Sequence, residues 1–300
     1  MTTPEMTVPG MTDLDTTDPS TAPYPLVDIA RSWLFVPGDR PDRYDKAAHS
    51  GADVVICDLE DAVAPADKDA ARADVAAWLA GGGSACVRVN ATNTSWGPDD
   101  VAALRAQPGL LAVLVPKAED PAALTAVADA LDVPVVALVE SALGVYRADD
   151  IAAAPGVARL AFGSLDYALD LSCGVDDDAL LHARSVLVLA SRLAGLPAPV
   201  DGVTTDLDDD AAVGVAARTA RRLGFGGTLC IHPRQVGPVN AVMAPSTAEA
   251  EYATQVLAAA GKGRAVRMDG QMVDAPVVQR ARQVLRRAQL FSGTDTEVSA

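Results

Sequence analysis

Short apolar runs alternate with amphipathic segments along most of the chain. From residue 30 onward, runs rich in Val, Leu and Ala are each followed by an Ala-rich stretch whose apolar positions recur with helical spacing. The apolar runs predict eight strands: Trp33–Val36, Asp53–Asp58, Ala85–Asn90, Ala112–Pro116, Val135–Glu140, Leu160–Gly163, Val200–Val203 and Thr228–His232. The amphipathic segments predict helices between them, among them Asp67–Leu79, Pro121–Ala130, Arg147–Ala153, Asp178–Ala194 and Asp210–Leu223.

This alternation determines the predicted fold class. A strand and a helix repeat about every 20–30 residues, which favours parallel strands joined by helical crossovers. Eight such repeats within roughly 200 residues are typical of a closed TIM (β/α)₈ barrel. A doubly wound open sheet is the alternative. However, no G-x-G-x-x-G sequence follows the first strand, as a dinucleotide site there would require.

The predicted barrel occupies residues 28–244. Residues 1–27 are rich in Thr, Pro and acidic residues and contain no Lys or Arg, so we expect a disordered tail there. Residues 245–288 look helical at both ends and predict a C-terminal helical lid outside the barrel. Residues 289–300 are expected to form a flexible tail.

Composition and charge narrow the possible partners and compartment. The chain has 24 basic and 40 acidic residues, a net charge of −16, which argues against a nucleic-acid partner because such binders need a basic face. No signal peptide precedes the fold, and no apolar run reaches the roughly 18 residues of a membrane span. We therefore expect a cytoplasmic protein that does not associate with membranes. The cysteines are expected to be buried, reduced thiols: Cys57, Cys86, Cys173 and Cys230.

Candidate chemistry gathers where the predicted strands end, which is where TIM barrels build their active sites. Glu140 ends the fifth strand and Asp166 follows the sixth, 166 − 140 = 26 residues later, so the two carboxylates are expected to be neighbours at the rim. Two carboxylates repel each other unless a cation or a shared proton intervenes. An all-oxygen site of this kind suits Mg²⁺. The competing interpretation is that each carboxylate forms an ordinary ion pair with an Arg or Lys at the rim.

Arg88 is a guanidinium within an apolar strand, and a buried arginine needs an anionic partner. One interpretation is a structural pair with Asp58 or Glu60. The other, which we favour, is that Arg88 binds a carboxylate or oxyanion of the substrate. The acidic sequence Asp58-Leu59-Glu60-Asp61 is expected to orient Arg88, Lys117 and metal-bound water from behind.

Eight sequence motifs, in order along residues 31 to about 288, resemble the citrate lyase β-subunit-like (CitE-like) branch of the HpcH/HpaI aldolase/citrate lyase superfamily. They are Arg31–Gly38, Gly51–Val63, Val87–Asn90, Pro116–Glu119, Val139–Gly144, Phe162–Tyr167, Gly226–Val236 and Asp269–Pro276. The resemblance implies a TIM barrel with a C-terminal helical lid, assembled as a homotrimer.

The resemblance also implies roles for particular residues. Glu140 and Asp166 match the Mg²⁺ ligands, Arg88 matches the substrate-binding arginine, and Glu140 also lies against substrate. Asp274 matches a lid aspartate that acts as acid or base in a neighbouring subunit's active site. Four further residues fall where relatives contact a CoA thioester: Phe35, Lys46, Ile231 and His232.

The implied reaction is Mg²⁺-dependent cleavage or formation of a carbon–carbon bond. The substrate would be a 3-hydroxyacyl-CoA thioester of the malyl-CoA, citramalyl-CoA or citryl type, giving an acyl-CoA enolate and a 2-keto acid. One alternative is an HpaI-like aldolase acting on free 4-hydroxy-2-keto acids. Such relatives usually rely on a His base, whereas His49 lies on the helix-like stretch 43–50. The other alternative is a carrier-dependent citrate lyase β subunit.

Overall fold

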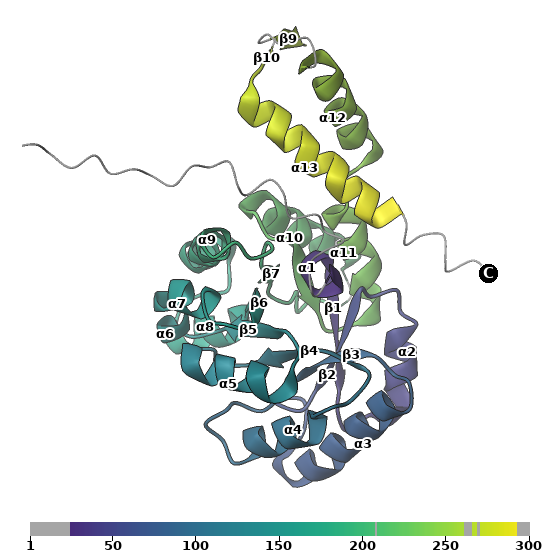
Figure 1. Ribbon diagram of the computed structural model, residues 1–300, viewed down its shortest axis with the longest axis vertical. Coiled ribbons are helices and arrows are strands. Elements are labelled where there is room, and N and C mark those ends of the chain that lie inside the picture. Colours follow the sequence, from purple (N-terminus) through teal and green to yellow (C-terminus); the bar gives the residue numbers. More distant parts are fainter. Residues whose placement is uncertain (1–24, 208, 261–265, 269–270, 293–300) are drawn as a thin grey trace, which may run out of the picture.

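The computed structural model describes residues 25–207, 209–260, 266–268 and 271–292. Eight parallel strands close into a barrel in sequence order (Figure 1), which confirms the predicted TIM barrel. The strands are β1 (Ser32–Pro37), β2 (Val54–Asp58), β3 (Ala85–Arg88), β4 (Leu110–Val115), β5 (Val135–Val139), β6 (Val157–Phe162), β7 (Val200–Asp201) and β8 (Gly227–Cys230).

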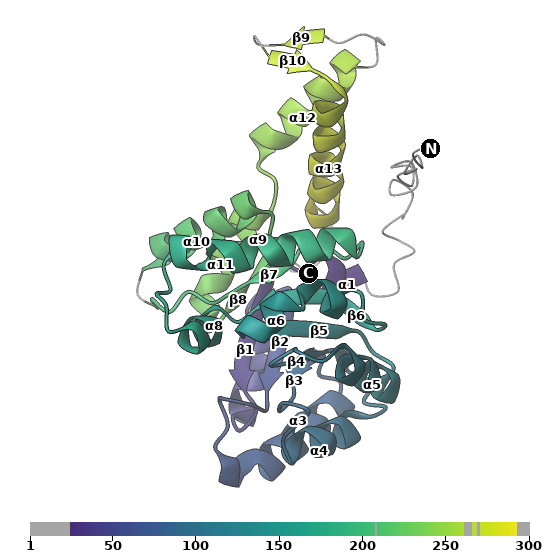
Figure 2. The same ribbon diagram turned by 90° about the vertical axis from the view of Figure 1, so that its left-hand side faces the viewer.

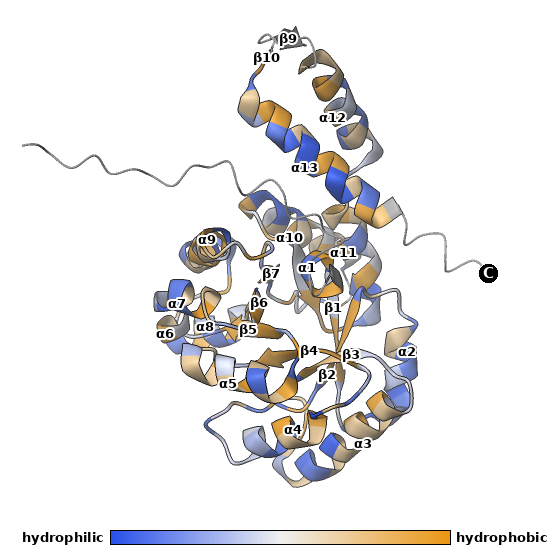
Figure 3. Cartoon of the chain, in the orientation of Figure 1, coloured by the Kyte–Doolittle hydropathy of each residue, from blue (hydrophilic) through white to orange (hydrophobic). Residues whose placement is uncertain are grey.

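Helices surround the barrel and cover the outward side of its strands (Figure 1). They are α2 (Tyr44–Ala48), α3 (Lys68–Ala80), α4 (Trp96–Leu104), α5 (Pro121–Leu131), α6 (Ala142–Tyr146), α7 (Ala148–Ala152), α8 (Ser164–Leu171), α9 (Asp177–Leu193), α10 (Asp210–Leu223) and α11 (Val236–Met243). Short 3₁₀ turns precede α2, α3 and α11, at Pro41–Arg43, Pro65–Asp67 and Pro233–Gln235 respectively. Figure 3 shows apolar strands inside helices that are apolar on one side and polar on the other.

The strands are buried on both faces, and their side chains alternate between two cores. Trp33, Ile56 and Leu114 belong to the cluster that fills the barrel interior. Their neighbours along the strands, such as Leu34 and Val113, belong to the larger cluster between strands and helices. This period of two decides which residues at the strand ends point into the mouth of the barrel.

The amino-terminal end of the barrel is closed by a short helix, α1 (Pro25–Ile29). Arg159 of β6 is fully buried, and its Nη1 donates to the carbonyls of Val27 and Ala30, both at 2.8 Å. The side chain of Val27 is also buried in the interior cluster. The tail predicted for residues 1–27 is therefore wrong at its last three residues, while residues 1–24 lie outside the described part of the chain.

The segment predicted to be a C-terminal lid, which we continue to call the lid, is a helical hairpin that projects from the barrel (Figure 2). It consists of α12 (Thr247–Ala260), an antiparallel pair formed by β9 (Val266–Met268) and β10 (Gln271–Val273), and α13 (Ala275–Ser292). Its own apolar cluster includes Val256, Val273 and Ala281. At its base, Glu249 pairs with Arg221 of α10 at 2.8 Å, and the guanidinium of Arg31 lies over the ring of Phe291.

Two expectations are corrected or completed here. Helix α13 continues to Ser292 and Phe291 is buried, so the flexible tail predicted from residue 289 begins too early; residues 293–300 lie outside the described range. Cys57, Cys86 and Cys230 are buried as expected, but Cys173 is exposed. Among the described helices, none has both the length and the apolar character needed to cross a bilayer.

Candidate active site

A cavity of about 460 Å³ opens at the carboxyl ends of the strands. It is lined by residues of β1, β2, β3, β5, β6 and β8, by the start of α8, and by Ile231, which follows β8. Five of the residues predicted from sequence line it together: Phe35, Arg88, Glu140, Asp166 and Ile231. Charged groups and apolar walls therefore meet in one cavity of a size that small-molecule sites commonly have.

Glu140 is the buried carboxylate of this cavity, 3% exposed. It follows the last residue of β5, and its Oε1 accepts a hydrogen bond from the backbone N–H of Lys117 at 2.8 Å. Gly163 packs directly on it: a Cβ at that position would overlap Cβ and Oε2 of Glu140. Burial, together with the charge of Glu60, raises the pKa of Glu140 to about 8. A bound cation would offset this burial by favouring the ionised form.

Asp166 lies in the first turn of α8, half-buried, and lines the same cavity as Glu140. Its charge is one of those that raise the pKa of Glu140, as expected for two carboxylates facing one space. Within the described ranges, no group of three or more His, Cys, Asp and Glu side chains is placed to hold a metal. The site thus offers two carboxylates, and the other ligands of a Mg²⁺ ion would come from water and substrate, as Mg²⁺ commonly allows.

Arg88 is held from behind by carboxylates. Its Nε and Nη2 donate to the two oxygens of Asp58 at 2.7 and 2.6 Å, and its Nη1 lies 3.0 Å from Oε2 of Glu60. Its guanidinium also stacks over the ring of Phe35, 4.9 Å from the centroid. The structural pair considered from sequence is therefore present, and Arg88 lines the cavity as well. Burial works to lower its pKa, but Asp58 and Glu60 outweigh burial and raise it.

Asp58 and Glu60 contact Arg88 from behind, as expected for the acidic stretch at residues 58–61. Asp58 pairs in register with Arg88 across β2 and β3, which explains their double hydrogen bond. Glu60 is buried, its Oε2 makes no hydrogen bond with good geometry, and Nζ of Lys117 lies 3.6 Å from its Oε1. Burial, opposed by the charge of Arg88, raises the pKa of Glu60 to about 7. The period of two along β2 places Asp58 inward and could have indicated this pairing.

The fold and this cavity can be compared with known proteins. The family model described as "HpcH/HpaI aldolase/citrate lyase" matches residues 31–233. The chain belongs to this family.

Individual relatives align with most of the length of this HpcH/HpaI family member. A citrate lyase subunit beta-like protein of Mycobacterium tuberculosis is 39% identical over 85% of this chain and 94% of its own length. A (3S)-malyl-CoA thioesterase of Cereibacter sphaeroides is 37% identical over 87% of this chain and 95% of its own. The crystal structure of CitE from M. tuberculosis in complex with magnesium, acetoacetate and coenzyme A matches with a TM-score of 0.76, 37% identity, and coverage of 87% of this chain and 98% of that one.

Three of the site residues predicted from sequence do not line the cavity in this family member. Lys46 is exposed on α2. His232 caps the 3₁₀ turn at Pro233–Gln235, where its Nδ1 accepts from the backbone N–H of Arg234 at 3.1 Å. Asp274 is an exposed residue between β10 and α13, and its Oδ1 accepts from the backbone N–H of Val277 at 3.3 Å.

The position of Asp274 follows from how the lid is attached. The lid's base contacts the ends of α10 and α11 and the start of β1, all on the amino-terminal side of the barrel. The β9–β10 pair, which leads directly to Asp274, is at the far tip of the hairpin (Figure 2). The chain's own lid therefore carries Asp274 away from its own barrel mouth. Part of the motif 269–276, namely residues 269 and 270, lies outside the described ranges.

Proposed function

We propose that this chain is a Mg²⁺-dependent carbon–carbon lyase that cleaves or forms 3-hydroxyacyl-CoA thioesters of the malyl-CoA, citramalyl-CoA or citryl type. The products of cleavage would be an acyl-CoA and a 2-keto acid. The observation that carries the proposal is the cavity that joins Glu140, Asp166 and Arg88. Related CitE structures were determined with magnesium, acetoacetate and coenzyme A, and with magnesium and oxaloacetate. Of these ligands, coenzyme A and oxaloacetate, a 2-keto acid, belong to the classes proposed for this chain.

The donor set of this cavity fits a magnesium ion. Glu140 and Asp166 would hold it, since both present carboxylate oxygens to one space and the burial of Glu140 is best offset by a cation. Bound there, the ion would supply Lewis-acid polarisation of a keto-acid carbonyl. Asp58 holds Arg88 in a fixed orientation beside this space, where its positive charge would stabilise the oxygen that becomes negative during the reaction.

The proton transfers require a further group, and we assign them to Asp274 of another copy of the chain in a homotrimer. In the cleavage direction, Asp274 would take the proton of the 3-hydroxyl group. The bond between the carbinol carbon and the α-carbon then breaks, and its electron pair passes to the thioester as an enolate. Asp274 would return the proton to the α-carbon, giving acyl-CoA and the 2-keto acid. The attachment of the lid on the amino-terminal side of its own barrel supports action in trans.

The placement of histidines argues against the aldolase alternative. Such an enzyme would need a His base near the first strands, but His49 is an exposed residue at the end of α2, and its Nδ1 lies 2.6 Å from the carbonyl oxygen of Asp45. His49 borders a different cavity, formed with the ends of α2 and α3 and the start of β2. We therefore retain the thioester substrate.

A panel of 3-hydroxyacyl-CoAs, supplemented with Mg²⁺, tests the proposal. Phenylhydrazine would trap the released keto acid, and thiol reagent would report free CoA. We expect keto acid without free CoA for at least one member of the panel. Release of free CoA and the intact hydroxy acid would instead indicate a thioesterase. Activity only with a carrier protein and partner subunits would indicate a citrate lyase β subunit.

A further inference from the structure

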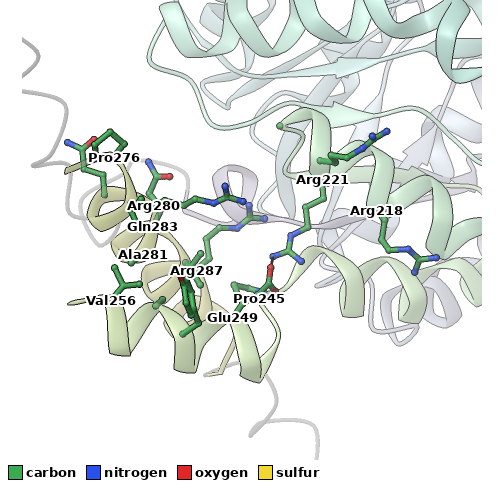
Figure 4. Close-up of a pocket in the computed structure, with 17 residues that line it drawn as sticks. Arg218, Arg221, Pro245, Glu249, Val256, Pro276, Arg280, Ala281, Gln283 and Arg287 are labelled. Atoms are coloured by element: carbon green, nitrogen blue, oxygen red, sulfur yellow. Dashed lines mark hydrogen bonds and ion pairs between the residues drawn. The ribbon is translucent and has the colours of Figure 1, made fainter. Parts of the chain in front are cut away.

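A second cavity lies where the lid joins the barrel. It has a volume of about 990 Å³ and lies between α10 on one side and α12 and α13 on the other (Figure 4). It is separate from the barrel mouth, since none of its lining residues lines the cavity around Glu140. We call this cavity the lid groove.

Arginines line the lid groove from both sides. They are Arg218, Arg221 and Arg222 of α10, and Arg280 and Arg287 of α13. Figure 4 shows Arg280 and Arg287 directed into the space between the helices, with Arg221 reaching toward it from α10. Of the lining residues that the structure describes, Glu249 is the one that is acidic. This concentration of positive charge stands out in a chain whose net charge is −16.

The positive charges of the lid groove are poorly neutralised. Among the described residues, Arg221 is the one arginine of the five with a carboxylate partner, Glu249 at 2.8 Å. Arg287 donates to the carbonyl of Met243 at 3.2 Å, which carries no full charge. Burial lowers the pKa of Arg287, and the charges of Arg221 and Arg31 lower it further. Arg221 and Arg287 are half-buried and the other three arginines are exposed. Guanidiniums that outnumber the nearby carboxylates are typical of sites for anions.

The shape and chemistry of the lid groove indicate the class of anion. Guanidiniums on opposing helices can donate several hydrogen bonds to an anion with many oxygens, and arginine binds phosphate oxygens especially well. The remaining walls are less polar, with Pro245, Tyr252, Val256 and Val277 among them. The volume lies within the range usual for small-molecule sites. A singly charged ion would leave most of these groups unused.

We propose that the lid groove binds an oligophosphate, either free or as part of a nucleoside 5′-triphosphate. The phosphates would lie between Arg222 of α10 and Arg280 and Arg287 of α13. Such a ligand bridges barrel and lid, because it bonds to helices on both sides. Its binding would therefore fix the orientation of the lid relative to its own barrel. The binding step does not depend on the reaction proposed for the barrel mouth.

The test is a titration of the full-length protein with tripolyphosphate in metal-free buffer at constant ionic strength, followed by calorimetry. We expect saturable binding of one ion per chain. Arg280→Glu and Arg222→Glu, which change exposed residues on opposite sides of the groove, should each weaken it by about tenfold or more. Arg282→Glu is the matched control, because Arg282 is exposed on the same helix but does not line the groove. Its effect should stay within about twofold, since salt screens distant charges.

Two further measurements make the result decisive. Bound tripolyphosphate should slow hydrogen exchange in α12 and α13, and Tyr252→Ala should weaken ATP but not tripolyphosphate if a ring occupies the groove. Equal affinity for ATP and tripolyphosphate would assign binding to the phosphates alone. Absence of saturable binding, or an equal loss in Arg282→Glu, would overturn the proposal. So would a change of oligomeric state in Arg280→Glu and Arg222→Glu with unchanged phosphate binding, which would identify the groove as an interface between copies.

Discussion

Arginines occur in two settings in this molecule, and the settings differ in how many carboxylates lie close to the guanidiniums. At the barrel mouth, Arg88 is held by Asp58 at 2.6–2.7 Å and approached by Glu60 at 3.0 Å. Among the described residues of the lid groove, five arginines are accompanied by one carboxylate, Glu249, which pairs with Arg221. In the first arrangement, the carboxylates fix the guanidinium before substrate binds and offset its positive charge. This suits a group that orients a substrate. The second leaves positive charge available, as suits a site that a multivalent anion fills.

The largest expected effect concerns the carboxylates that face Arg88 across the mouth. Glu140→Gln and Asp166→Asn should each reduce Mg²⁺-dependent turnover by about 10³-fold or more, because the loss of a metal ligand removes several kcal/mol of transition-state stabilisation. Initial rates of keto-acid release measure this. Asp178→Asn, at an exposed position in the first turn of α9, is the control and should retain activity. Substantial Mg²⁺-dependent activity in Glu140→Gln would refute the metal assignment.

The next largest effect tests whether the lid of one chain completes the active site at the barrel mouth of another. Asp274→Asn should lower turnover by about 10²–10⁴-fold while keto-acid binding is retained, because it removes only the proton-transferring group. Mixing Asp274→Asn chains with Arg88→Ala chains should restore part of the activity, since some sites then combine an intact mouth with an intact Asp274. No recovery in verified mixed oligomers would contradict action in trans.

A matched pair of substitutions tests the two arginine settings directly. Arg88→Met should lower the free energy of unfolding by about 3–5 kcal/mol, because it leaves the buried carboxylate of Asp58 unpaired. Arg280→Met should change it by no more than about 0.5 kcal/mol, because Arg280 is exposed among like charges. Urea unfolding followed by circular dichroism gives both values. Equal losses in the two variants would remove the distinction.

The smallest expected effect is a pH dependence. Glu140 has a pKa of about 8 in the folded protein against an ordinary 4.5, so between these values the folded state holds a proton that the unfolded chain has released. The stability of the metal-free protein should therefore fall as pH rises through this interval, and Glu60, with a pKa of about 7, acts in the same direction. Stabilisation by Mg²⁺ should grow over the same interval, because ligation needs the ionised carboxylate. Thermal melts measure this loss, at roughly 2–4 °C for each kcal/mol of stability. A pH-independent effect of Mg²⁺ would contradict the role of Glu140.

Much of the fold was predictable because its signals are local. Apolar runs bounded by helical segments located all eight strands, and the end of each strand then located Glu140 and Asp166 in one cavity. Strand order alone makes the ends of β5 and β6 neighbours, so no contact had to be known in advance. The errors fell at the two ends of the chain, where the short helix α1 and the last turn of α13 gain their order from tertiary contacts with Arg159 and Arg31.

What sequence could not predict depends on register and on distance along the chain. The register of β2 with β3 sets Asp58 opposite Arg88, and because the sequence does not give this register it offered the pair only as one of two interpretations. The lid groove combines residues of α10 and α13 that are about 60 positions apart, on two helices whose packing no motif indicated. Lys46 and His232 were proposed from resemblance alone, and the structure places both outside the cavity lining. A role for either in thioester binding therefore stays a prediction.

The direction in which the lid projects has a consequence for enzyme kinetics. If Asp274 serves the mouth of another chain, a single chain has a substrate cavity without the residue that transfers the proton, and catalysis begins only after association. Specific activity should then depend on protein concentration, falling on dilution toward the dissociation constant of the assembly and recovering when the protein is concentrated again. For this barrel, the kinetic order of the reaction with respect to enzyme concentration would measure how the chains assemble.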